Sequence, residues 1–218
     1  MIMPFPSGYA EAKVGGSSER ILPGGHLCVI RSMRVEYSKA DNKMLVMEFD
    51  TDKSDPQPQY FLNRYIADNQ AGRDPVWRGV YRVVVDERAV DKNGDRYGLS
   101  NLKRLNTTIC DSNPGFELND NFYMPDSSVK TNEAKINNER YCEQFKGEKI
   151  GIVFREEEYT DQTSGELKVS IKPYYACNYS EVMDQPVPER KRQQPKATGS
   201  EQWMQVPEGL GDEGLPFK

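Results

Sequence analysis

The sequence has little of what metal sites and nucleophilic catalysis use most. Histidine occurs once, at His26, where a strand begins, so no mechanism that needs two histidines is available. The four cysteines form no CxxC pair and fit no zinc spacing, and we expect small, mostly buried side chains at Cys28, Cys110, Cys142 and Cys177. A phosphate-binding loop and a dinucleotide-binding glycine pattern are also missing. From these residues we therefore expect neither a cofactor nor a bound metal.

Long apolar runs and a strong positive charge are absent too. No run approaches the roughly 18 residues that span a bilayer, and the first residues have neither the basic start nor the apolar stretch of a signal peptide. We therefore expect a cytoplasmic protein without a membrane partner. Lys and Arg number 29 against 34 Asp and Glu, a net charge of -5, which excludes a uniformly basic coat. Basic side chains can still gather on one face.

Composition divides the 218 residues into three parts. Residues 1–20 are rich in Gly, Ser and Pro and indicate a flexible leader. Residues 21–182 carry the periodic apolar segments of one folded domain. Residues 183–218 contain five prolines, four glycines and the basic run 190–192, and cannot bury enough apolar surface to fold alone. We expect this last part to be a disordered, acidic-tipped tail.

The periodic segments favour a mainly β domain. Residues 26–39 and 44–51 read as a hairpin, and residues 149–159 and 166–175 form a second one with clear period-two alternation. Residues 59–66 are predicted to be a third strand, and residues 76–87 fit a strand or a helix. Residues 99–111 space their leucines as an amphipathic helix, and residues 117–140 read as an irregular insertion. One helix between strands three and four is typical of an OB-fold, a five-stranded Greek-key barrel with a groove across its strands.

Aromatic and basic residues are interleaved along most of these strands. Single-stranded nucleic acid needs cations for its phosphates and flat rings for its exposed bases, each stacked base contributing roughly 1–3 kcal/mol. The alternative is that the rings fill the core and the cations are solvated on the surface. Because the combination of rings and cations recurs on several strands, a nucleic-acid-binding groove is favoured. The candidate nucleic-acid-binding residues are Arg31, Arg34, Tyr37, Tyr60, Arg64, Tyr65, Trp77, Arg78, Tyr81, Arg82, Phe154, Arg155, Tyr159, Lys168, Lys172 and Tyr174.

The end of the chain places two carboxylates before a proline-stiffened apolar tip. Such a peptide can seat its Phe in a hydrophobic pocket with a basic rim on another protein, or occupy its own basic groove until nucleic acid displaces it. A frayed terminus is the plainer alternative. The candidate partner-binding residues are Asp212, Glu213, Leu215, Pro216 and Phe217.

One constellation points instead to an enzyme. Glu166-x-Lys168 is similar to half of a magnesium-dependent nuclease site. The same spacing occurs at Glu11, Glu133 and Glu189, and no strand aspartate completes it. The run Glu156 to Glu158 is better explained as a solvated strand end than as a metal site.

Five segments in fixed order carry a family resemblance: LPGGHLCVI (22–30), KMLVMEFD (43–50), WRGVYR (77–82), CDSNPGF (110–116) and FKGEKIGIVFREEEY (145–159). They resemble a family of phage and mobile-element proteins, formerly of unknown function, regarded as single-strand-DNA-binding proteins of OB-fold type. The resemblance covers about residues 20–180. It implies a role in phage DNA replication, recombination or repair, within the infected or element-carrying bacterial cell.

The last residues carry a second, independent resemblance. GDEGLPFK is similar to the acidic tip of bacterial single-strand-DNA-binding proteins, which recruits replication and repair enzymes. Lys218 departs from that pattern, in which Phe comes last.

We expect a non-enzymatic protein that binds single-stranded DNA without reading its sequence and recruits replication or recombination proteins through its tail. A protein-interaction adaptor that does not bind DNA is the first alternative, and a magnesium-dependent nuclease is the second. The oligomeric state, homo-oligomers included, and a preference for DNA over RNA are left open by the sequence.

Overall fold

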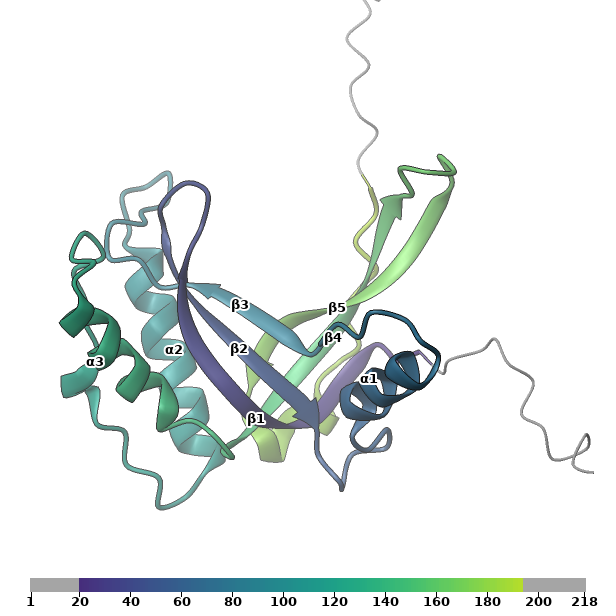
Figure 1. The fold of residues 1–218 in the computed structure, drawn as a ribbon, viewed down its shortest axis with the longest axis horizontal. Coiled ribbons are helices and arrows are strands. Elements are labelled where there is room, and N and C mark those ends of the chain that lie inside the picture. Colours follow the sequence, from purple (N-terminus) through teal and green to yellow (C-terminus); the bar gives the residue numbers. More distant parts are fainter. Residues whose placement is uncertain (1–19, 194–218) are drawn as a thin grey trace, which may run out of the picture.

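The computed structural model of the chain describes residues 20–193 (Figure 1). The expected leader, except for Arg20, lies outside the described residues, as do the candidate partner-binding residues Asp212, Glu213, Leu215, Pro216 and Phe217.

Five antiparallel strands form one open sheet, so the expectation of a mainly β domain is confirmed. The strands are β1 (Gly24–Tyr37), β2 (Lys43–Thr51), β3 (Val80–Val84), β4 (Lys149–Thr160) and β5 (Leu167–Cys177). Their order in the sheet is β3-β2-β1-β4-β5, which makes β3 and β5 the two edge strands.

Helices cover the two ends of this sheet. The described residues contain α1 (Tyr60–Gln70), α2 (Tyr97–Ser112), α3 (Asn132–Glu143) and the short 3₁₀ helices η1 (Asp120–Phe122) and η2 (Tyr179–Asp184). Figure 1 shows α2 and α3 together at one end, and α1 at the other end near the base of the β4–β5 hairpin. Within residues 20–193, no helix has the length and apolarity to cross a membrane.

The prediction of a strand at residues 59–66 is wrong, because this segment is helix α1. Its first free N–H groups are satisfied by the end of β2: Asp50 accepts from Phe61 N at 2.9 Å, and Thr51 Oγ1 accepts from Tyr60 N at 2.8 Å. Gln59, at the N-cap position, provides no side-chain hydrogen bond. A cap supplied from another element stabilises the helix start as a local cap does. The third strand is β3, inside the segment 76–87.

Residues 117–140 are also more regular than expected, and the domain has three α-helices rather than one. Helix α3 starts at a regular N-cap, since the Thr131 hydroxyl accepts a hydrogen bond from Ala134 N at 3.1 Å. Ala134, Asn138 and Tyr141 are buried at helical spacing. This signal was present in the sequence but was overshadowed by the polar residues around it. The helix predicted over 99–111 is confirmed as α2.

Both predicted hairpins are confirmed. Leu45, Met47 and Phe49 of β2 share one buried face with Ile30 and Met33 of β1, as period-two alternation requires. Against this face pack the apolar sides of α2 and α3, which contribute Leu105, Ile109, Tyr141 and Cys142, together with Phe145 just after α3.

Lys43 is an exception inside this core. Its side chain is fully buried; Nζ donates to the Met124 carbonyl and lies 3.9 Å from the centre of the Tyr123 ring. Burial lowers the pKa of Lys43 to about 8. The amine is thus held by a carbonyl and a ring rather than by an ion pair.

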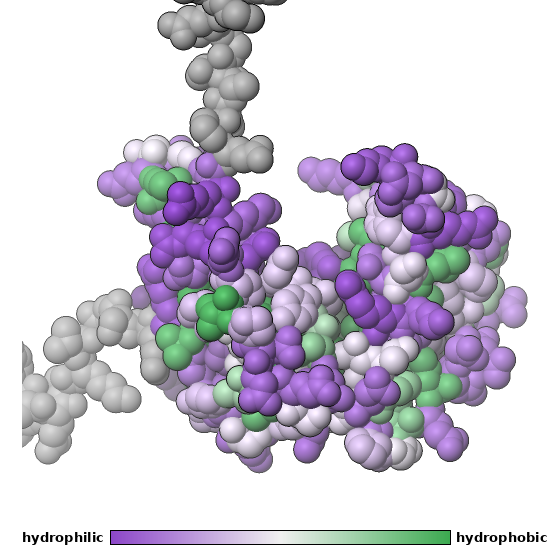
Figure 2. Space-filling view, turned by 180° about the vertical axis from the view of Figure 1, so that it is seen from behind, coloured by the Kyte–Doolittle hydropathy of each residue, from purple (hydrophilic) through white to green (hydrophobic). Residues whose placement is uncertain are grey.

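The sheet is strongly curved, and the β1–β2 and β4–β5 hairpin ends project from it on the same side (Figure 1). Figure 2 shows that the surface is hollowed between the two projections and that both projections are mainly hydrophilic. Residues 190–193, assigned to the tail by composition, lie along β4 in the second projection: Lys191 N donates to Glu156 O, and Glu158 N donates to Lys191 O, both at 2.9 Å.

Candidate nucleic-acid interface

Six of the sixteen candidate residues come together at one end of the sheet, and we call them the α1 cluster. They derive from three segments distant in sequence: β1, helix α1 and the loop before β3. The members are Arg31, Tyr60, Arg64, Tyr65, Trp77 and Arg78.

Trp77 is the centre of the α1 cluster. The Arg31 guanidinium lies 4.4 Å from the centre of its ring system, and the Tyr65 ring centre lies at 6.1 Å. The Trp77 Nε1–H donates to Gly79 O at 3.1 Å, which fixes the ring. Gly79 permits this arrangement, because a Cβ there would lie 2.2 Å from Phe49 O. Phe61 packs behind Trp77, with ring centres 6.5 Å apart.

Two acidic residues lie beside the cluster, and their pairing with its arginines is loose, whereas Asp68 is held more closely by Arg73, at 3.2 Å. Asp50 is 3.8 Å from Arg31, and Asp68 is 3.9 Å from Arg78. Burial raises the pKa of the Asp50 carboxyl, although backbone N–H groups of Phe61 and Thr51 oppose this by binding its charged form. Arg64 has no carboxylate within 4.0 Å among residues 20–193; one of its Nη groups donates to the Tyr60 hydroxyl at 3.2 Å. The cluster thus combines one exposed ring, Tyr65, and two half-buried rings, Tyr60 and Trp77, with positive charge that carboxylates only partly neutralise.

Arg34 and Arg82 lie on the face of the sheet that points away from α3. Both are directly opposite Val46, on either side of β2, and residues opposite one another share a face. Arg34 is tightly paired, with Glu48 at 2.6 Å and Glu36 at 2.7 Å. Arg82 is exposed and follows the α1 cluster along β3. Arg82 therefore extends the cationic surface, whereas the charge of Arg34 is largely cancelled.

Five candidates lie on the β4–β5 projection, where carboxylates neutralise the cations. Glu157 contacts Arg155 at 2.9 Å and Lys172 at 3.4 Å, and Lys168 is paired with Asp161. These cations lower the pKa of Glu157 and hold that of Asp161 at about 2. Arg155 also covers the Tyr174 ring, 3.9 Å from its centre, and Tyr159 is exposed beyond them.

The run Glu156 to Glu158 was expected to be a solvated strand end, but it is an ion-paired surface. Arg190 contacts Glu156 at 2.6 Å and Glu158 at 3.8 Å. The basic run of the expected tail thus pairs with the acidic run of β4.

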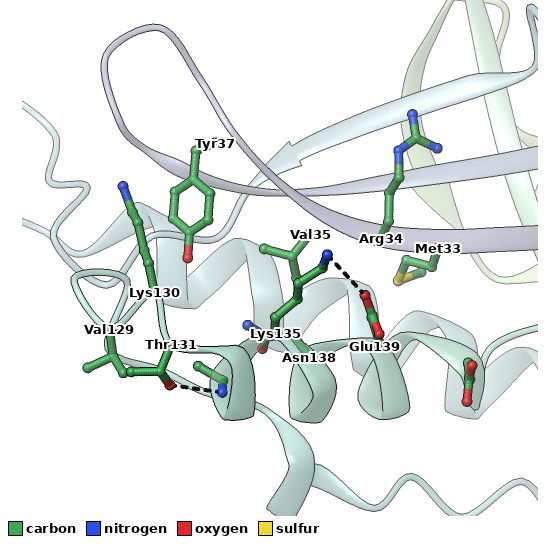
Figure 3. A pocket seen from close by; sticks show the side chains of 12 residues that line it. Met33, Arg34, Val35, Tyr37, Val129, Lys130, Thr131, Lys135, Asn138 and Glu139 are labelled. Carbon is green, nitrogen blue, oxygen red and sulfur yellow. Dashed lines mark hydrogen bonds and ion pairs between the residues drawn. The ribbon is translucent and has the colours of Figure 1, made fainter.

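Three candidates do not lie on the open surface. Phe154 is only 1% exposed and packs against Phe49 and Phe61, so it cannot stack on a base; its phase with Ile150 and Ile152 places it in the core. Tyr81 faces inward opposite Met47, and burial raises its pKa. Tyr37 lies on the α3 side of β1 with Lys130 over its ring, while Arg34 points the other way (Figure 3).

His26 and the cysteines have structural roles. The imidazole lies near the start of β1, as expected, and is buried, with Nδ1 3.0 Å from Asp55 and Nε2 3.0 Å from Leu22 O. Cys28 and Cys142 are buried, as expected, whereas Cys110 and Cys177 are half-buried; all four are free. Burial raises the pKa of the Cys142 thiol to about 12.

The geometry around Glu166 gives the nuclease alternative no support. Glu166 is exposed in the β4–β5 turn, and its neighbour Lys168 is engaged by Asp161. In the described part of the chain, no three or more His, Cys, Asp or Glu side chains are grouped so that they could hold a metal ion.

Sequence reasoning missed two residues at the site. Phe61 supports both Trp77 and Tyr60, with the Tyr60 ring centre at 5.1 Å, and Arg20 lies beside the cluster at the start of the described chain. A helical reading of 60–70 would have found Phe61, since Phe61 and Asp68, seven residues apart, are both buried. Nothing in the sequence around Arg20 indicated its position.

Comparison of the chain with protein-family models gives no match, and neither does a comparison with curated proteins.

Proposed function

We propose that the protein binds single-stranded DNA without sequence preference, through the α1 cluster and the adjoining Arg82. The observation that carries this proposal is that three separate segments bring Trp77, Tyr60 and Tyr65 together with arginines whose charge carboxylates only partly cancel. Rings can stack on any base, and guanidinium groups can bind phosphates, so neither contact reads sequence.

The sheet topology is compatible with an OB-fold. A five-stranded Greek-key barrel opened between strands three and five gives the order β3-β2-β1-β4-β5. Helix α2 follows β3 and packs into the core, as the helix between strands three and four does in such a barrel. In OB-folds the loops between strands one and two and between strands four and five flank the ligand. Here these loops end the two projections on either side of the hollow (Figures 1 and 2).

In this proposal the α1 cluster divides the work between its side chains. Trp77 and the two tyrosines stack on bases, while Arg31, Arg64 and Arg78 neutralise phosphates. Arg31 also holds the Trp77 ring from one side, so removing Arg31 weakens both contacts. The carboxyl-terminal tip would recruit replication or recombination proteins, as its resemblance implies.

The decisive experiment is a fluorescence-anisotropy titration of the full chain with labelled oligo-dT and with a duplex of equal length. We expect tighter binding of the single strand, with an affinity that falls as salt is added, by about 0.7 in the log–log slope for each phosphate neutralised. Equal affinity for the duplex, or none for the single strand, would remove the proposal. No binding of DNA at any salt concentration would favour the adaptor alternative.

A further inference from the structure

A cavity of about 230 Å³ adjoins the α1 cluster on the side that faces β5. Tyr60, Phe61 and Arg64 of α1 form one wall, and Ile171 and Pro173 of β5 form the opposite wall. The cavity therefore joins the candidate interface to the base of the β4–β5 projection.

Among residues 20–193, the charged side chains that line this cavity are all positive. Arg20, Arg64 and Arg78 contribute to it, and no carboxylate of the described chain does. The larger cavity between β1 and α3, about 530 Å³, is different: Glu139 and Glu143 line it together with cations, and Lys135 lies 4.0 Å from Glu139 (Figure 3). The smaller cavity is thus the one whose lining favours an anion.

Arg64 shows which anion chemistry the cavity requires. Its Nε is buried and has no hydrogen-bond partner among residues 20–193, while Nη1 donates to the Tyr60 hydroxyl. Buried donors are normally satisfied, and a guanidinium binds planar or tetrahedral oxyanions through paired N–H groups. An oxyanion with several acceptors, such as phosphate, matches this unsatisfied donor.

We propose that this cavity binds the terminal phosphate of a DNA strand, with the adjoining nucleotide against Tyr60 and the Ile171–Pro173 wall. This inference rests on the proposed function. A terminal phosphomonoester carries a charge of about -1.5 to -2 at neutral pH, whereas an internal phosphodiester carries a single charge. The more highly charged group matches three arginines, of which only Arg78 has a carboxylate within 4.0 Å among residues 20–193, Asp68 at 3.9 Å.

The test compares three labelled dT oligonucleotides of one length: one with a 5′-phosphate, one with a 3′-phosphate and one with hydroxyl groups at both ends. The full chain should bind one of the phosphorylated strands about five- to ten-fold more tightly than the hydroxyl strand. Arg64→Gln should abolish this preference. Arg140→Gln removes the same charge from α3, at the opposite end of the sheet, and should retain it. Thermal melting of each variant checks the fold.

The outcomes separate this inference from the proposed function. Equal affinity for the three strands would overturn the terminal-phosphate site while leaving single-strand binding intact. If Arg64→Gln then weakened all three equally, Arg64 would be assigned to an internal phosphodiester. An end preference that survives Arg64→Gln would also overturn the site. Failure of every strand to bind would overturn the proposed function itself.

Discussion

The α1 cluster and the β4–β5 projection have similar composition but different electrostatics. Both combine arginine or lysine with tyrosine, and both have a guanidinium over a ring, Arg31 over Trp77 and Arg155 over Tyr174. In the projection, Glu157 and Asp161 pair with the cations at close range. In the α1 cluster, the nearest carboxylates are 3.8 and 3.9 Å away, and Arg64 has none within 4.0 Å among the described residues.

This difference shows why interleaved rings and cations identify an interface only after their neighbours are known. A phosphate must compete with any carboxylate that already holds the cation, so paired cations contribute less to binding than unpaired ones. The α1 cluster should therefore dominate the affinity for single strands, and the projection should contribute only when its pairs are broken.

The largest expected effect comes from Trp77, the ring at the centre of the α1 cluster. Trp77→Ala should weaken oligo-dT binding by about 1–3 kcal/mol, roughly five- to 150-fold, because the loss of a stacking ring costs this much per base. Tyr174→Ala in the projection should change the affinity less than two-fold. Anisotropy titrations at one fixed salt concentration measure both.

Because Trp77 packs on Phe61, its loss also affects the fold, and a matched variant separates the two effects. Trp77→Phe keeps a ring and should recover most of the affinity. If Tyr174→Ala weakens oligo-dT binding as much as Trp77→Ala does, the proposed difference between the projection and the α1 cluster is wrong.

Lys43 extends the comparison to a third environment, a buried cation held by a carbonyl and a ring. Its folded-state pKa of about 8 lies below the ordinary value of 10.5, so the unfolded chain binds more protons between these two pH values. The contribution of Lys43 to stability therefore rises with pH through this window. Relative to Lys43→Met, the wild type should gain about 1–2 kcal/mol between pH 7.5 and 9.5.

Urea unfolding of both proteins at the two pH values measures this difference. Groups remote from Lys43 are common to both proteins, so their contribution cancels in this difference. A stability difference that does not change with pH would show that Lys43 remains fully charged in the folded state.

Local patterns predicted the strands well because their alternation is short-ranged. The segments 44–51, 149–159 and 166–175 each have one apolar face. The structure pairs the first with β1 and the other two with each other, as predicted. Segment 59–66 fitted a strand equally well over eight residues, and the groups that make it a helix, Asp50 and Thr51, lie in another element. Such a tertiary cap is invisible to a local reading.

The sequence predicted which residue types form the candidate site, but not which individual residues belong to it. Six of the interleaved residues meet in the α1 cluster, because the chain folds α1 and the loop before β3 against β1. Phe154 has the sequence context of a stacking residue yet lies in the core, as its phase in β4 requires. Contacts across strands and with residues 190–193, such as Arg190 with Glu156, decide which cations are neutralised. No local sequence pattern contains these contacts.

Breaking the ion pairs of the β4–β5 projection should reduce the difference in DNA affinity between the projection and the α1 cluster. Glu157→Gln removes the carboxylate shared by Arg155, Lys172 and Lys191. Exposed pairs contribute about 0.2–1 kcal/mol each, so the released cations should raise the affinity for oligo-dT up to about five-fold at low salt. The isosteric Glu133→Gln on α3 removes the same charge away from the projection and controls for net charge. Equal gains from both variants would show that the pairing in the projection is irrelevant to binding.

The smallest expected effect concerns residues 201–218, which carry four carboxylates and one lysine. Deleting them removes net negative charge, so repulsion of the strand falls and the affinity for oligo-dT should stay equal or rise by about two-fold at low salt. The gain should disappear at high salt, where long-range charge is screened. A replication partner that binds the full chain should no longer be recruited in a pull-down. A marked loss of DNA binding on deletion would instead place part of the interface in these residues and shift the comparison away from the α1 cluster.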